Sequence, residues 1–122
     1  MKTLKMEEMM ANKLYKPILI DSIKASEDVV QQRFIGFDGK YCQAGAKAFG
    51  VSDVDMAKDQ YLPVAISGIL LVEAGGTFAV GSEIASDENG KAVKAESSAI
   101  SNGYALDDAT EGQIVRIVRG IS

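Results

Sequence analysis

The sequence predicts an all-β fold: a small barrel or sandwich of short antiparallel strands, built from two similar β units, with an N-terminal arm that can be helical. Three observations predict it. One long segment alternates apolar and mixed positions, short apolar runs alternate with Gly-rich turns, and the second half of the chain repeats a pattern of the first. With 122 residues the chain can bury a substantial core. We expect an arm at residues 1–15 and a single β domain at residues 16–122.

The longest expected strand spans residues 60–73. Its even positions are all apolar or Gly, whereas its odd positions mix polar and apolar residues. Since successive strand side chains point to opposite faces, one face of this strand should lie in the core. A straight strand of this length would span about 45 Å, whereas a compact domain of this size has a radius of gyration of ~14 Å. We therefore expect the strand to bend at Gly68.

The N-terminal arm is rich in good helix formers, and its apolar residues recur at helical spacing. A helix this short would be marginal by itself. We therefore expect the arm to dock, either on its own domain or on a neighbouring chain, through adaptable apolar side chains. The residues expected to make this contact are Leu4, Met6, Met9, Met10 and Leu14.

The first half of the β domain should contain short strands separated by polar connections. Asp38 and Gly39 form a hairpin signal. Residues 21–28 are polar, and we expect them to be irregular or to form one helical turn. The expected strands are residues 16–20, 29–37, 40–43 and 47–51.

The second half, after a Gly-Gly pair at residues 75–76, should also contain short strands separated by polar connections. Asn89 and Gly90 form the strongest hairpin signal of the chain. A brief apolar run lies at residues 77–80. The expected strands after it are residues 83–86, 91–94, 103–106 and 113–119.

An internal repeat links the two halves. Residues 50–60 align without gaps with residues 103–113, an offset of 53 positions, and the strands that follow keep the same phase. Two copies are too few for a solenoid, so we expect two similar β units that close one core. The identical pairs are Gly50 and Gly103, Asp55 and Asp108, and Gln60 and Gln113.

Composition bounds the function. The net charge of −4 argues against a nucleic-acid surface, which would need a basic face. The single cysteine, Cys42, cannot form an intrachain disulfide. No targeting segment is recognisable, because Glu7 and Glu8 interrupt the N-terminal apolar residues, and the longest apolar run is too short to cross a bilayer.

The sequence carries no recognisable catalytic equipment. It has no histidine, and Cys42 lies in an expected strand, which favours a buried structural thiol. Acidic pairs occur at residues 53–55 and 107–108, but turns favour Asp, and the full calcium-loop spacing is missing. Arg116 and Arg119 are interpreted as a solvated strand face or a subunit contact. We expect no enzyme activity, no cofactor and no metal.

The second half of the chain resembles a family of small phage proteins, the capsid cement or head decoration proteins. The likeness covers roughly residues 28–120 and consists of Gly and turn positions in a fixed order. The arm departs from the short N-terminus expected of the family. The motifs are VAISG at 64–68, VEAGG at 72–76, Gly81, ASD at 85–87, GK at 90–91, GYAL at 103–106, DATEG at 108–112 and VRIV at 115–118.

The resemblance implies a structural virion protein that binds the outer surface of an assembled phage capsid and stabilises it. It implies a major capsid protein as partner, a homo-oligomer with a trimer favoured over a dimer, no nucleic-acid or membrane partner, and synthesis in the cytoplasm of the bacterial host. Two alternatives stay open. One is a small soluble β-barrel binding module for a peptide or sugar, which should expose an aromatic cluster in one cleft. The other is a carboxylate-dependent enzyme that uses the acidic pairs at residues 53–55 and 107–108.

Overall fold

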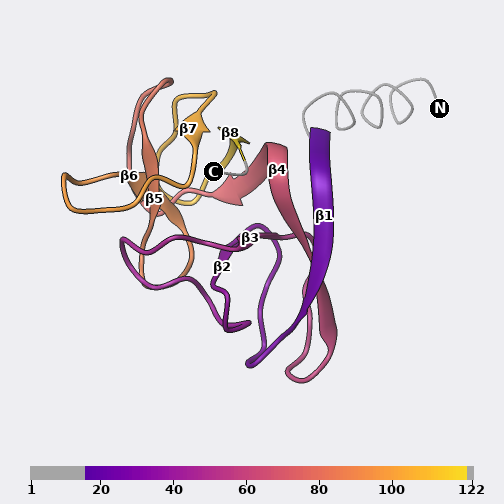
Figure 1. Ribbon diagram of the computed structural model, residues 1–122. Coiled ribbons are helices and arrows are strands. Elements are labelled where there is room, and N and C mark those ends of the chain that lie inside the picture. Colours follow the sequence, from indigo (N-terminus) through magenta and orange to yellow (C-terminus); the bar gives the residue numbers. More distant parts are fainter. Residues whose placement is uncertain (1–15, 121–122) are drawn as a thin grey trace.

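The computed structural model describes residues 16–120, and every regular element in that range is a β-strand, which confirms the predicted all-β class. Six strands form one curled antiparallel sheet, and the other two form a hairpin (Figure 1). The strands are β1 (Lys16–Lys24), β2 (Phe34–Ile35), β3 (Gly50–Ser52), β4 (Tyr61–Glu73), β5 (Ile84–Ser86), β6 (Ala92–Lys94), β7 (Tyr104–Ala105) and β8 (Ile114–Arg119).

Strand β4 holds the sheet together. It pairs with β1 and β3 along its first half and with β8 along its second half. The alternation in the sequence predicted the fully buried side chains correctly at Leu62, Val64, Leu70 and Val72. Gly68 lies where the pairing changes, opposite Pro17 on one side and Arg119 on the other, and its φ of 113° supports the predicted bend.

The internal repeat is real at the level of strand register. In the first half Val51 pairs with Ala65, and in the second half Tyr104 pairs with Val118, each 53 positions later. The pairing of β1 with β4 in the first half is repeated by the pairing of β4 with β8 in the second half. The pair Ile23 and Leu62 corresponds to the pair Val72 and Val115. The pair Lys24 and Tyr61 corresponds to the pair Glu73 and Ile114.

These registers define a first unit at residues 16–65 and a second unit at residues 65–118. Strand β4 belongs to both, since its first half closes the first unit and its second half opens the second. Equivalent residues of the two units are 49 positions apart in the sequence before the hairpin of each unit and 53 positions apart after it. Ile35 bridges to Tyr41, whereas the equivalent Ile84 pairs with Lys94, so the hairpin of the second unit is four residues longer.

Each unit has its own buried cluster, made from equivalent positions. The cluster of the first unit contains Ala25, Val29, Ile35, Leu62 and Val64. Their counterparts Ala74, Phe78, Ile84, Val115 and Ile117 all lie in the larger cluster around the second unit. That larger cluster also takes in Phe34, Val51 and Ala65 from the first unit, so one side of the first unit packs onto the second.

Two stretches differ from the sequence-based expectation. Residues 21–24 continue β1 instead of turning, because their backbone pairs with residues 61–64 of β4. The strands expected at residues 29–37 and 40–43 shrink to β2 and single bridges at Val29 and Tyr41. Tertiary hydrogen bonds hold these irregular segments, such as the 2.7 Å bond from the amide of Phe34 to the carbonyl of Gly90.

Candidate binding surfaces

Three carboxylates of the two acidic pairs, those of Asp55, Asp107 and Asp108, hold loops together. An oxygen of Asp55 accepts a 2.8 Å hydrogen bond from the amide of Gln31, and Asp108 accepts the equivalent 2.8 Å bond from Val80. Asp107 forms a 2.7 Å ion pair with Arg116, whose hydrogen bond lowers the pKa of the carboxyl. Within residues 16–120 no group of three or more His, Cys, Asp or Glu side chains is placed to hold a metal ion.

Cys42 is buried at 1% exposure, as the sequence predicted. Its Sγ lies 3.4 Å from the carbonyl oxygen of Ala46. Burial raises the pKa of this thiol, and a hydrogen bond with Ser86 opposes the effect only in part. A buried thiol with a raised pKa is a packing residue, since the reactive species of cysteine is the thiolate.

The two arginines of β8 have different roles, and the interpretation of both as a surface pair is wrong. Arg116 is half-exposed in its ion pair with Asp107. Arg119 is buried at 5% exposure, and its guanidinium donates to the carbonyl oxygens of Ala48, Phe49 and Ile66. Burial lowers its pKa. Arg119 therefore ties the last strand of the second unit to the first unit.

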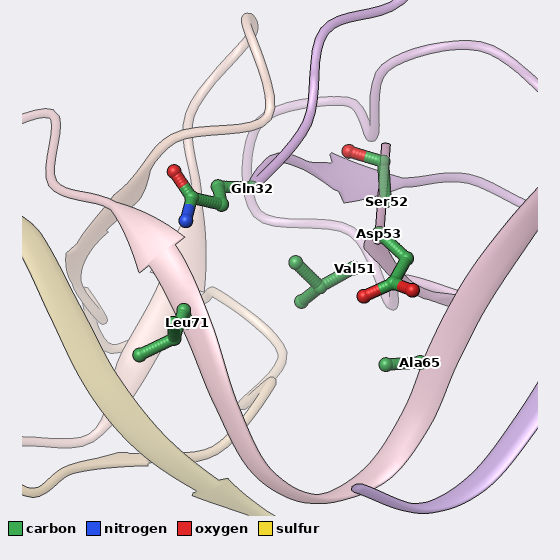
Figure 2. A pocket seen from close by; sticks show the side chains of 6 residues that line it. All are labelled: Gln32, Val51, Ser52, Asp53, Ala65 and Leu71. Carbon is green, nitrogen blue, oxygen red and sulfur yellow. The ribbon is translucent and has the colours of Figure 1, made fainter. Parts of the chain in front are cut away.

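A cavity of about 150 Å³ lies inside the bend of β4. Figure 2 shows that its walls come from β3, from β4 and from the loop before β2. Sites for small organic ligands usually enclose about 300–1,000 Å³. The cavity is thus smaller than a usual ligand site, and we interpret it as a packing gap between the two units. The lining residues are Gln32, Val51, Ser52, Asp53, Ala65 and Leu71.

The first candidate binding surface is β1. This strand pairs with β4 alone among the described strands, so its other edge has free backbone groups (Figure 1). Ile18, Leu19 and Ile20 are exposed at 82%, 40% and 47%. Two register shifts interrupt the ladder around Leu19. An unpaired edge strand that carries three consecutive exposed apolar residues is a typical protein-binding surface.

The expected contact residues of the arm, Leu4, Met6, Met9, Met10 and Leu14, lie outside the described residues. In the sequence, the arm immediately precedes β1, which begins at Lys16. The sequence did not single out residues 18–20 as exposed, although it held a signal. At the positions equivalent to the buried Leu70 and half-buried Leu71, the first unit has Asp21 and Ser22, which mark β1 as solvated.

The second candidate surface crosses three neighbouring backbone segments of the second unit. Glu83 bridges to Tyr104, which pairs with Val118, and all three side chains are exposed. The Tyr104 hydroxyl donates to a carboxylate oxygen of Glu83 at 3.3 Å. Tyr104 and Val118 are 50% and 42% exposed. Sequence periodicity missed this surface because short strands give too few positions to show an exposed face.

No helix among residues 16–120 is long and apolar enough to cross a membrane.

Comparison with known proteins matched a protein family and a solved structure, among other chains. A family model described as phage cement protein matches residues 16–120. A crystal structure of the head fiber gp8.5 N base of bacteriophage phi29 superposes with a TM-score of 0.70 at 24% sequence identity, covering 85% of this chain and 95% of that one. At that identity the likeness concerns the fold. No curated protein sequence matched the chain.

Proposed function

Because the chain belongs to the family of phage cement proteins, and is thus a structural component of a phage virion, we propose that it binds the outer surface of an assembled capsid and stabilises it. A protein that binds only the assembled lattice stabilises that lattice by its binding free energy. The partner in this proposal is the major capsid protein. The protein acts without catalysis, as a homo-oligomer with a trimer favoured, after synthesis in the cytoplasm of the bacterial host.

The observation that carries the proposal is the surface of β1. Ile18, Leu19 and Ile20 remain exposed on an edge strand whose outer backbone groups have no strand partner among the described residues. A capsid protein can extend the sheet along this edge and cover the apolar side chains at the same time. The arm at residues 1–15 precedes β1 in the sequence and adds a second contact. Two linked contacts strengthen binding through effective concentration.

Co-sedimentation with purified heads of the phage that encodes the chain tests the proposal. Wild-type protein should pellet with assembled heads and saturate, whereas it should stay in the supernatant with unassembled capsid protein. Ile18→Asp should weaken head binding by about tenfold or more, because it places a charge on the apolar surface that the capsid protein would cover. The variant should still fold, since the Ile18 side chain is 82% exposed. Val80→Asp is the matched control, since Val80 is also exposed, at 58%, but lies in a loop of the second unit.

The contribution of the arm is tested separately. Deletion of residues 1–14 should leave the β domain folded, as measured by circular dichroism, and should weaken head binding. Binding equal to wild type would remove the arm from the proposal. Failure of the full chain to pellet with heads at any concentration would overturn capsid binding itself.

A further inference from the structure

A row of paired residues crosses the sheet where β1 begins. Tyr104 pairs with Val118, and Val118 pairs with Ile69. On its other side, Ile69 pairs with Lys16, the first residue of β1. Because residues directly opposite each other on neighbouring strands place their side chains on one face of a sheet, these four side chains form a row over β7, β8, β4 and β1 (Figure 1). We call these four residues the transverse row.

The transverse row is apolar on β7, β8 and β4, and much of it faces solvent. Tyr104 and Val118 are 50% and 42% exposed, and Ile69 is half-buried. Tyr104 and Val118 also line a hollow of about 310 Å³ together with Ile100, which is 49% exposed. Exposed apolar side chains that gather around a hollow mark an interaction surface.

The place where the arm joins the β domain indicates what occupies this surface. Residue 15 is bonded to Lys16, so the arm at residues 1–15 is attached to one end of the transverse row. Three strand spacings of ~4.8 Å, or about 14 Å, separate Lys16 from Tyr104. As a helix, fifteen residues would reach about 22 Å, and an extended chain would reach farther. The arm is therefore long enough to cross the whole row.

The apolar residues of the arm match the row in spacing. Leu14, Met10 and Met6 recur every four residues, which places them about 6 Å apart in a helix. The three apolar residues of the row recur at the strand spacing of ~4.8 Å. Charge agrees at the far end, where Lys2 of the arm would reach Glu83, which is exposed and bridges to the last residue of the row.

We propose that the arm folds back over its own sheet and packs Leu14, Met10 and Met6 onto the transverse row. Its own sheet is favoured over that of a sister chain because the bond to Lys16 gives the arm a high effective concentration at this surface. Methionine side chains suit such a contact, since they adapt to an uneven surface. The polar side of the arm then stays outward, where it is available for the proposed capsid contact. The inference does not rest on capsid binding, so the isolated full-length protein tests it.

Paired cysteine substitutions in the isolated protein test this contact. The variant with Met10→Cys and Val118→Cys should form a disulfide within one chain under mild oxidation, because the two side chains lie within disulfide reach when the arm is docked. Met10→Cys with Val54→Cys is the matched control, since Val54 is also exposed, at 38%, but lies in the loop between β3 and β4. Native Cys42 is 1% exposed and should stay reduced. Mass spectrometry of tryptic peptides identifies each disulfide, and gel filtration separates single chains from linked pairs.

Limited proteolysis of variants without new cysteines gives a second test. Trypsin should cut within residues 1–15 about tenfold faster in Val118→Asp than in wild type, because the charge displaces the arm from the row. Val54→Asp should be cut at the wild-type rate, and circular dichroism should show both variants folded. Three results would overturn the proposal: a disulfide that joins two chains, an intrachain yield no higher than in the Val54→Cys control, or a folded Val118→Asp variant whose arm is cut at the wild-type rate.

Discussion

Gly68 carries the bend of β4, and its backbone conformation leaves no room for a side chain. With φ at 113°, a Cβ atom would lie 2.7 Å from the amide nitrogen of Ile18 and against the carbonyl oxygen of Lys16. Gly68→Val should lower the free energy of unfolding by about 3 kcal/mol or more, through steric overlap with β1 and backbone strain. Chemical denaturation measures this change.

Gly81→Ala is the control for strain alone. Gly81 also has a positive φ, 86°, but a Cβ there would have no atom within 4 Å. Its replacement should cost only about 1 kcal/mol. Equal destabilisation by Gly68→Ala and Gly81→Ala would show that the close approach of β1 to Gly68 is unimportant.

Arg119 is expected to matter far more for stability than its neighbour Arg116. Arg119→Met leaves the carbonyl groups of Ala48, Phe49 and Ile66 without their buried donor, at a cost of about 3 kcal/mol. Arg116→Met breaks an ion pair at the surface, where the effect should be small. Thermal melting of the two variants checks the order, and equal melting temperatures would contradict it.

Glu73 should make stability depend on acid pH. Burial alone would raise the pKa of this carboxyl, but hydrogen bonds and charge from Arg33 and Lys91 outweigh burial and lower it. Its stabilising contribution is therefore present above its ordinary pKa of 4.5 and is lost as the pH falls through the lower folded value. Melting temperature against pH should fall less steeply below pH ~4.5 in Glu73→Gln than in wild type. Parallel curves would remove Glu73 from the acid response.

Residue-level roles were the least predictable from sequence. The burial of Cys42 was predicted from its place in an expected strand, and the structure confirms the burial. Arg119 could not be predicted, because its partners are backbone carbonyls that the fold brings together from positions 53 to 71 residues earlier. A charged residue at the end of an alternating strand is ordinarily exposed.

At the scale of elements, β4 and β1 should differ in local stability. Strand β4 is paired on both sides at Val64 and Ala65 and carries five side chains that are at most 1% exposed, whereas β1 is an exposed edge strand. In the free protein, hydrogen-bonded amides of β4 should exchange only by global unfolding, and those of β1 should exchange faster by local opening. Hydrogen exchange followed by NMR measures both, and equal protection of β1 and β4 would contradict this difference.

The sequence predicted strands correctly where the apolar alternation extended over many residues. It failed where pairing with another strand determined whether a segment is a strand. The thirteen residues of β4 and the six of β8 gave clear patterns. The Asn89-Gly90 turn correctly joined β5 to β6. In contrast, residues 21–24 form part of β1 only because β4 lies beside them, and two-residue strands such as β2 carry no period at all.

At the scale of the molecule, the repeat in the sequence foretold two similar units, but it could not show that they share a strand. That sharing follows from two offsets, 49 and 53, which only the paired registers reveal. Strand β1 pairs with β4 alone among the described strands, and its other edge is the surface proposed above for the capsid.

The temperature at which purified heads fall apart, measured with and without saturating protein, tests capsid stabilisation most directly. Heads saturated with wild-type protein should survive to a higher temperature than bare heads. Val80→Asp should give the same increase, and Ile18→Asp at the same concentration should give little or none. Heads that carry a full complement of wild-type protein, yet fall apart at the temperature of bare heads, would contradict the proposed function.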